Sequence, residues 1–314
     1  MASVSMAAPD WRVVKSSYPT DSTIVAGYSV HEFGANADGK TDSTKAFQKA
    51  LDAMYADGGG TVFVPEGFYV LRGSLTIPSS VTLRGEWREP TEADATVKGT
   101  VLMAYADKGD EDATPLIRLK VSAGIRDLSI WYPQQRADQP VAYPYTLAQD
   151  GFDNATFKNL TLVNPYKGIQ IGPKGNELHY VHNVYGTPLK KGIRYDSTTD
   201  IGRLEKVTFS SRYWAESGLP GSRGIKDDLE RWLYSEAVGL HMLRSDWEYV
   251  DQVSVEGYNI GFMVTRGVRG SANAQFRKLI LKNCATALSV EKTNPYGMVF
   301  SECVFEGNEE AVVL

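Results

Sequence analysis

Two short stretches of this chain carry an ionisable side chain two residues behind a glycine and further charged side chains just beyond it. Residues 192–196 read Gly-Ile-Arg-Tyr-Asp, and residues 239–246 read Gly-Leu-His-Met-Leu-Arg-Ser-Asp. If the two glycines occupy equivalent positions in neighbouring strands, the side chains behind them lie in rows about 5 Å apart. The ionisable residues gathered in this way are Arg194, Asp196, His241, Arg244 and Asp246.

Paired carboxylates beside basic groups could hydrolyse a glycosidic bond. Such hydrolysis needs one carboxyl group on each side of the bond, about 6.5–9.5 Å apart for inversion and about 5 Å apart for retention. We predict Asp246 as the general acid, Asp196 as the base and His241 as a third catalytic residue. Arg194 and Arg244 are expected to bind the substrate. A simpler interpretation stays open, in which both carboxylates are solvated charges paired with these arginines.

Aromatic residues in two long loops could complete such a site, because sugar rings stack on flat aromatic faces. Trp131 and Tyr132 open a loop over residues 131–145. Tyr213 and Trp214 lie in an insert over residues 210–236, whose second half is expected to form a short helix. We predict these four aromatics as substrate-binding residues. The alternative is that they pack the loops onto the body of the protein.

A repeat in the second half of the chain predicts how these residues are positioned. Six segments share a short apolar strand, a turn on Asn or Gly, and a small residue that opens a second strand. The small anchor residues are Gly168, Gly192, Gly239, Gly261, Ala287 and Ala311. Their intervals are 22 to 26 residues, with one of 47 that holds the insert. Such a period is typical of stacked coils with a shared core and predicts an all-β parallel β-helix.

The turns and strands of the repeat support this register. The turn residues four positions before the anchors are Asn164, Pro188, Gly257, Asn283 and Gly307. The Asn and Gly residues among them are expected to adopt the left-handed backbone that a sharp bend needs. Leu160 and Leu162 are expected to point inward and Thr161 outward. A β-sandwich is the alternative, but its two-residue Asn-Gly hairpins are absent from the sequence.

The N-terminal part predicts a helix over residues 43–56, capped by Asp42, with an apolar stripe. The stripe consists of Ala46, Phe47, Ala50, Leu51 and Met54. The surrounding runs FGANADGKTDSTKAFQKAL, GGGTVFVPEGFYVL and LTIPSSVTLRGE resemble the N-terminal cap and first coil of the pectate-lyase-like superfamily. That superfamily includes polygalacturonases, family 55 β-1,3-glucanases and phage tailspikes.

The resemblance implies a right-handed parallel β-helix with an N-terminal capping α-helix and long loop insertions. It also implies structural roles for Asp38, Asp42 and Glu86, and it does not identify the reaction. The polygalacturonase signature of Asn-Thr-Asp, Asp-Asp, Gly-His-Gly and Arg-Ile-Lys is missing.

The domain organisation is expected to be an N-terminal arm over residues 1–28 and a single β-helix domain over residues 29–314. Residues 88–115 are charged and turn-rich, which predicts a surface loop. The chain ends at Leu314 in the middle of a strand, so we expect a truncated β-helix or a second β-helix segment or partner chain that covers this end.

Composition excludes some classes of function. A net charge of −5 without a basic face argues against nucleic-acid binding. No apolar run approaches the roughly 20 residues of a membrane span. We find no phosphate loop, metal motif or cysteine cluster, and we expect no cofactor and no metal. The expected partner is a polysaccharide or oligosaccharide. We expect a secreted or periplasmic protein, although no signal peptide is present.

Three functions remain open on the sequence alone. The first is a glycoside hydrolase that cleaves a polysaccharide, of β-1,3-glucan type, by carboxylate acid/base catalysis. The second is a polysaccharide lyase acting on a uronate polymer, for which Arg194 and Arg244 would neutralise the carboxylate and His241 would be the base. The third is a non-catalytic glycan-binding or tailspike-type module.

Overall fold

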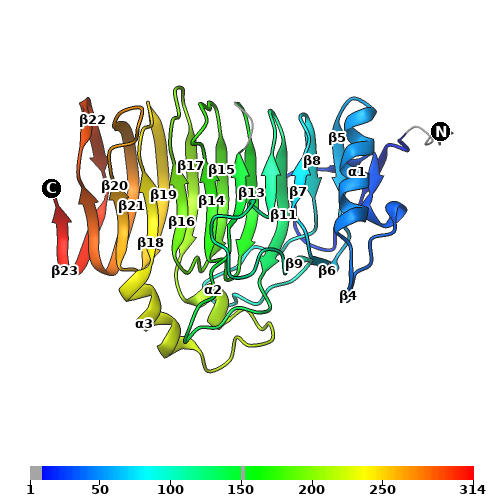
Figure 1. Cartoon of the computed structure of the whole chain (residues 1–314), viewed down its shortest axis with the longest axis horizontal. Helices are drawn as coiled ribbons and strands as arrows, with labels where there is room; N and C mark the ends of the chain where they lie inside the picture. The colour runs from blue at the N-terminus through cyan, green and yellow to red at the C-terminus, as the bar shows by residue number, and fades with distance from the viewer. Residues whose placement is uncertain (1–8, 150–152) are drawn as a thin grey trace.

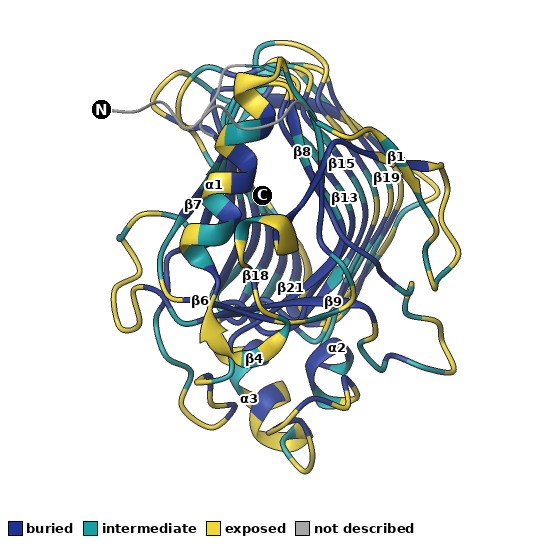
Figure 2. Ribbon diagram, turned by 90° about the vertical axis from the view of Figure 1, so that its right-hand side faces the viewer, coloured by how far each residue is buried: buried dark blue, intermediate teal, exposed yellow. Residues whose placement is uncertain are grey.

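The computed structural model describes residues 9–149 and 153–314. Parallel strands stack into a three-sided solenoid, with α1 (Thr44–Ala56) across its N-terminal end (Figures 1 and 2). We call the three sides sheets A, B and C, in the order in which each coil visits them. The predicted parallel β-helix with an N-terminal capping helix is confirmed.

Sheet A is followed in most coils by sheet B within one continuous bent strand. Sheet A comprises β3 (Tyr28–Ser29), β5 (Gly60–Phe63), β8 (Val81–Arg84), the first parts of β11 (Gly124–Trp131), β13 (Thr156–Leu162), β15 (Tyr180–Gly186), β17 (Arg203–Phe209), β19 (Glu248–Glu256) and β21 (Ala272–Val290), and β22 (Thr293–Ser301). Sheet B comprises β4 (Asp38–Asp42), β6 (Gly67–Leu71), β9 (Thr100–Ala104), the later parts of β11, β13, β15, β17 and β19, the middle of β21 and the start of β23 (Val304–Val313).

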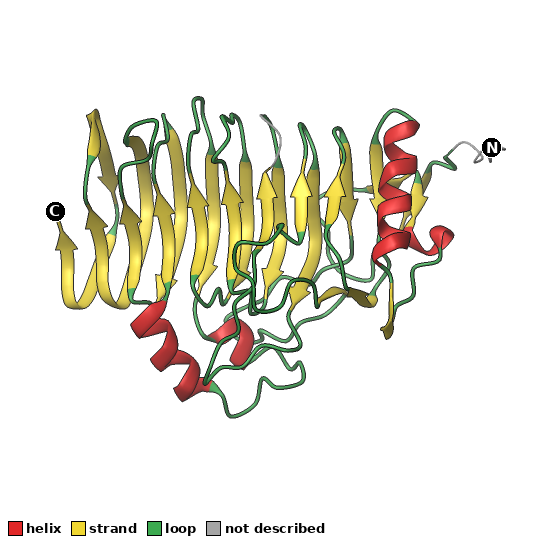
Figure 3. Cartoon of the chain, in the orientation of Figure 1, coloured by secondary structure: helices red, strands yellow, loops and turns green. Residues whose placement is uncertain are grey.

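Sheet C carries one strand per coil. It comprises β7 (Leu75–Ile77), β10 (Ile117–Leu119), β12 (Tyr145–Gln149), β14 (Lys167–Ile171), β16 (Lys191–Tyr195), β18 (Val238–Met242), β20 (Ile260–Val264), and the last parts of β21 and β23. Figure 3 shows that strands make up most of the body, with helices only at the N-terminal end and in the insert. The insert holds α2 (Arg212–Ala215) and α3 (Lys226–Glu236), which confirms its predicted second-half helix.

The six anchor residues lie in one row of sheet C, as the repeat predicts. Pairings such as Lys191↔Val238 and Ile193↔Leu240 place each anchor opposite the next. A Cβ atom on Gly192 would lie 2.2 Å from the carbonyl oxygen of Gly239, and one on Gly168 would lie 2.4 Å from that of Gly192. The anchors are therefore small because the next coil leaves no room for a side chain.

The left-handed residues lie mainly at a different bend from the predicted one. Of the five predicted turn residues, only Gly257 and Asn283 have positive φ. The bend between sheets A and B instead has a left-handed residue in every coil from β11 to β22, whether small or long. These residues are Asp127, Asn159, Asn183, Lys206, Gln252, Lys278 and Glu302, with φ between 53° and 59°. The sequence did not predict this row, because Lys, Gln and Glu at several of its positions are not typical of a left-handed backbone.

A ladder of hydrogen bonds runs along the first part of this bend. The Arg84 guanidinium donates to Asp127 at 2.6 Å, the Asn159 amide donates to Asp127 at 2.6 Å, and the Asn183 amide donates to Asn159 at 3.0 Å. All four side chains are buried. The ladder satisfies polar groups that would otherwise be lost from water and ties four coils together.

The N-terminal cap matches the expected local structure with small shifts. Helix α1 has Ser43 at its N-cap position, and the Asp42 carboxylate accepts from the Thr44 backbone N–H at 3.0 Å. Phe47, Ala50, Leu51 and Met54 are buried as predicted, whereas Ala46 is half-buried. Within the predicted arm, β1 (Arg12–Val14) and β2 (Ile24–Ala26) form an antiparallel pair. A 3-10 helix, η1 (Val30–Phe33), follows the arm. Residues 1–8 lie outside the described part.

Two further expectations concern residues near this end. Glu86 accepts backbone N–H groups from Ser17 and Glu66, and Asp38 accepts from Lys40 and Thr41, so these carboxylates have structural partners. The prediction of an uninterrupted surface loop over residues 88–115 is wrong, because β9 lies within it and is fully buried.

We predict that Asn159→Ala lowers the free energy of unfolding by about 2–3 kcal/mol. It removes two buried hydrogen bonds and places alanine in a left-handed backbone. Gln252→Ala is the matched control, since Gln252 has φ 55 but is exposed and bonds only to Asp251. Urea denaturation should show a loss of about 1 kcal/mol for the control. Equal losses for both variants would contradict a stabilising role of the ladder.

Candidate active site

The outer face of sheet C brings together the residues behind the anchors. Gln170, Arg194, His241 and Met263 occupy one row of adjacent strands, as the register predicts. Arg194 and His241 are direct neighbours on β16 and β18, about 5 Å apart along the solenoid axis. Both side chains are half-buried, so they can meet a ligand while remaining partly removed from water.

A second row on the same face adds positive charge that sequence analysis missed. Tyr145, Lys167 and Lys191 pair in register on β12, β14 and β16. The Lys167 ammonium lies 2.8 Å from the Glu111 carboxylate and 5.4 Å from the centre of the Tyr145 ring. Burial lowers the pKa of Lys191, and the charges of Arg194 and Lys167 lower it further. The sequence signal that could have predicted this row is the lysine directly before each of the anchors Gly168 and Gly192.

His241 is a neutral imidazole at neutral pH. Burial, with Lys191 and Arg194 nearby, lowers its pKa to about 4, against a smaller opposing effect of Asp196. Its Nε2 atom lies 2.9 Å from the Thr265 hydroxyl, and its buried Nδ1 atom has no hydrogen-bond partner within the described chain. A neutral imidazole with a free ring nitrogen can accept a proton.

Arg194 also has an unused hydrogen-bonding group. One terminal nitrogen, Nη2, donates to the Asp196 carboxylate at 2.8 Å. The other, Nη1, is buried and has no partner among the described residues. Since a buried guanidinium nitrogen without an acceptor is costly, it is suited to bind an anionic group of a ligand.

The two predicted carboxylates are ion-paired with arginines on their own turns. Asp196 is only 5% exposed, and its Oδ1 lies close enough to Gly267 that a Cβ there would approach it to 2.9 Å. Asp246 pairs with Arg244, whose other terminal nitrogen donates to the Thr198 carbonyl. Burial raises the pKa of Asp246, and Asp200 adds to this while Arg244 opposes it. The ion pairs of the simpler interpretation are present, although Asp196 is buried rather than solvated.

The four predicted aromatics do not line this face with open rings. Trp131 and Tyr132 are 5% and 1% exposed, and Tyr213 and Trp214 are 6% and 2% exposed. The Tyr213 ring lies 5.4 Å from that of Tyr185, on the outer side of sheet B. Because all four rings are buried, they expose little surface on which a sugar could stack, and their burial fits the alternative that they pack onto the body of the protein.

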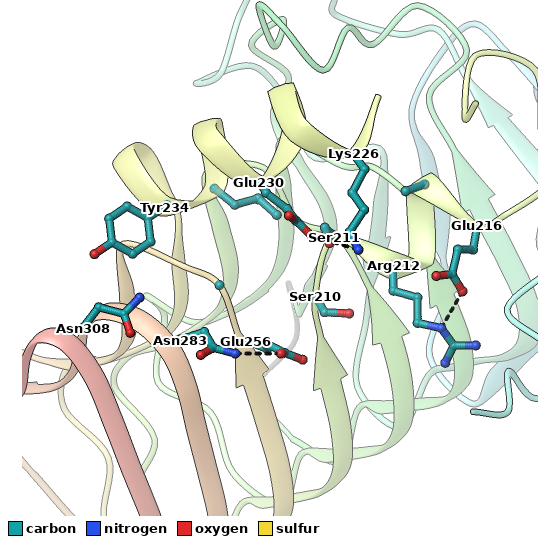
Figure 4. A pocket seen from close by; sticks show the side chains of 13 residues that line it. Ser210, Ser211, Arg212, Glu216, Lys226, Glu230, Tyr234, Glu256, Asn283 and Asn308 are labelled. Atoms are coloured by element: carbon teal, nitrogen blue, oxygen red, sulfur yellow. Dashed lines mark hydrogen bonds and ion pairs between the residues drawn. The ribbon is translucent and has the colours of Figure 1, made fainter. Parts of the chain in front are cut away.

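The insert builds a separate cavity between its helices and the last turns from sheet B to sheet C (Figure 4). This cavity has a volume of about 510 Å³. Its carboxylates have partners within it: Glu216 with Arg212, Glu230 with Ser211, and Glu256 with Asn283. No predicted site residue lines it.

A family model described as rhamnogalacturonase A/epimerase, pectate lyase-like, matches residues 27–313. The chain belongs to this family. Among known proteins it is similar to alginate lyase 7 of Azotobacter vinelandii, with 34% identity over 147 residues, which is 43% of this chain and 16% of that protein. It is also similar to the mannuronan C5-epimerase AlgE5 of the same organism, with 38% identity over 98 residues, 29% of this chain and 9% of the relative. The chain thus spans less than a fifth of these relatives.

Solved structures confirm the fold. A tailspike protein mutant of E. coli bacteriophage HK620, in complex with a hexasaccharide, matches with a TM-score of 0.56 and 13% identity. The match covers 88% of this chain and 50% of that one.

Outside residues 1–8 and 150–152, no three His, Cys, Asp or Glu side chains could jointly hold a metal ion. None of the described helices has the length and apolar character to cross a membrane.

The depressed pKa of His241 predicts acid sensitivity. In the unfolded chain this imidazole takes up a proton near pH 6.5, whereas in the folded chain it does so only near pH 4. The unfolded state binds more protons in that window, so stability should fall as the pH drops from about 6.5 to about 4. His241→Gln should remove about 1–2 kcal/mol of this loss, measured as urea midpoints at pH 7 and pH 4.5. Parallel pH profiles of the two proteins would contradict the assignment.

Proposed function

We propose that this chain acts on a uronate-containing polysaccharide and removes the proton α to a uronate carboxylate, as a lyase or an epimerase. The observation that carries the proposal is the outer face of sheet C, where Lys191 and Arg194 border a neutral His241 with a free ring nitrogen. Cationic groups beside an unprotonated base are the arrangement that this chemistry requires.

The residues divide the reaction between them. Removal of the α-proton pushes an electron pair toward the carboxylate, which becomes more negative in the transition state. Lys191 and the free Nη1 of Arg194 stabilise that charge, because fixed cations in a partly desolvated site lower the energy of a developing anion. His241 accepts the proton. In a lyase the electron pair then expels the oxygen of the 4-linked glycosidic bond, and in an epimerase the carbon takes a proton from the opposite face.

The relatives support this class over hydrolysis. The curated names are those of an alginate lyase and mannuronan C5-epimerases, and neither reaction consumes water at the glycosidic bond. Hydrolysis would need Asp196 and Asp246 free to act, whereas both are ion-paired with arginines. The sequence-based preference for a hydrolase therefore gives way to its lyase alternative. Action on an extracellular polymer would fit a secreted or periplasmic protein.

A non-catalytic glycan-binding module is the second candidate. A short match to the pre-neck appendage protein of Bacillus phage B103, with 39% identity over 59 residues, covers 19% of this chain and 6% of that protein. The name of that relative describes a phage structural part rather than an enzyme, which keeps this candidate open.

Turnover of alginate tests the proposal. In D₂O an epimerase should place deuterium on the carbon α to the carboxylate. A lyase should instead leave that carbon in a double bond without hydrogen, which gives absorbance near 235 nm. Arg194→Gln should lower kcat by about 10²–10³-fold and His241→Gln by about 10²–10⁴-fold.

In the wild type, kcat/KM should fall as the pH drops through about 4, where His241 takes up a proton.

Two controls separate the alternatives. Asp246→Asn should retain most α-proton exchange, whereas a hydrolase that uses Asp246 would lose its activity. Arg277→Gln removes an exposed, ion-paired arginine on sheet A and should change nothing. New reducing ends from a neutral glucan without deuterium exchange would contradict the proposal, and no turnover of any polymer would favour a binding module.

A further inference from the structure

One row of exposed side chains runs parallel to the solenoid axis where each coil enters sheet A. The strand register continues through Ser80, Ser122, Asn154, Leu178, Ile201 and Trp247 in successive coils. All six are exposed. The row changes character along the axis, from small polar residues in the first three coils to large apolar residues in the next three.

The backbone at this row disfavours large apolar residues. Ser80, Ser122 and Asn154 have φ of 60°, 55° and 62°, and Leu178 and Trp247 have φ of 55° and 57°. Small polar residues tolerate this left-handed conformation, whereas a bulky side chain there is strained. The fold itself would therefore be served at least as well by Asn as by Leu178 or Trp247.

Burial does not repay this strain. Leu178, Ile201 and Trp247 are 49%, 40% and 46% exposed. The backbone N–H of Trp247 donates to the buried side-chain oxygen of Asn273 at 2.5 Å, which holds the backbone from which the exposed ring projects. Strained, exposed residues fixed by a buried partner are typical of surfaces that bind a ligand.

Aromatic and charged groups extend the row into a surface with the chemistry of a glycan site. The Trp247 ring lies 5.7 Å from the ring of Tyr296, which is 75% exposed. In the next outward row, Tyr249 and Arg203 are neighbours on β19 and β17. Both line a hollow of about 460 Å³ on the outer face of sheet A, and Arg203 also lines one of about 300 Å³ with Leu178 and Ile201.

Arg203 supplies the charge complementarity. Within residues 9–149 and 153–314 it forms no ion pair and no side-chain hydrogen bond, while its neighbour Arg277 is neutralised by Asp251. An exposed guanidinium beside flat apolar side chains can bind a sugar carboxylate while the rings stack on pyranose faces.

We propose that Leu178, Ile201, Trp247 and Tyr296, with Tyr249 and Arg203, form a second, non-catalytic binding stripe for a uronate polysaccharide. The turns that lead from sheet C to sheet A separate this stripe from Arg194 and His241. Its side chains recur once per coil, about 5 Å apart, which suits a polymer chain lying along the axis. The choice of polymer rests on the proposed function; the stripe itself rests on the geometry of sheet A.

The test is retention of the full chain in an alginate gel, with Arg194→Gln in every protein so that the sheet C face contributes little. Leu178→Asn combined with Trp247→Asn should weaken alginate binding by roughly fivefold or more. Its thermal midpoint should stay the same or rise, because Asn suits the left-handed backbone. Arg203→Gln should weaken alginate binding as well. Ser122→Asn, in the same row but outside the stripe, is the matched control and should change neither quantity.

The outcomes are distinct. A double variant with a lower thermal midpoint and unchanged retention would show a structural role and overturn the stripe. If the protein with an unchanged stripe is retained as strongly by a neutral β-1,3-glucan gel as by the alginate gel, the assignment to an anionic chain is overturned. Turnover is measured separately, on the chain with native Arg194. If that chain turns over alginate while the stripe variants are retained normally, the stripe alone is overturned. Stripe-dependent retention, with no turnover by the chain with native Arg194, would overturn the proposed function alone.

Discussion

Backbone hydrogen bonding between successive coils is the constraint on which the rest of this structure depends. Each strand pairs in parallel with its equivalents in the coils before and after it, so equivalent residues form rows along the axis. A slip of one residue would exchange the inner and outer faces of a coil. The anchor glycines of sheet C prevent such a slip, because a Cβ on Gly168, Gly192 or Gly239 would meet the backbone of the next coil. The buried ladder from Arg84 to Asn183 holds the opposite corner.

The same constraint explains how a mildly acidic protein creates a local cationic face. Register places Lys167 on β14 beside Lys191 and Arg194 on β16, although Lys167 is 24 residues before Lys191 in the sequence. Burial lowers the pKa values of Lys191 and His241, and the neighbouring cations lower them further. Nearby carboxylates limit that repulsion, since Glu111 pairs with Lys167 and Asp196 pairs with Arg194. One terminal nitrogen of Arg194 and one ring nitrogen of His241 are left for a ligand.

Sequence alone predicted the parts of the structure that periodicity controls. The anchor row, the outward row from Gln170 to Met263 and the apolar stripe of α1 all follow from residue spacing, and all are confirmed. Burial within loops does not follow from spacing, so Trp131 and Trp214 were expected at a surface that they do not reach. Strand β9 was not predicted because charged segments surround it. Lys191 was not predicted as a site residue because a lysine at the end of a strand is usually exposed to solvent. The ion pairs of Asp196 with Arg194 and of Asp246 with Arg244 are those of the alternative that the sequence left open, whereas the burial of Asp196 depends on turn geometry.

The most direct measurement for the central claim is a crystal structure with a bound uronate oligosaccharide, obtained with the inactive His241→Gln variant. The account predicts a sugar carboxylate on the outer face of sheet C, within hydrogen-bonding distance of Arg194 Nη1 and close to Lys191, with the α-carbon facing residue 241. An oligosaccharide ordered instead in the cavity beneath α3, with the Arg194 face empty, would contradict it.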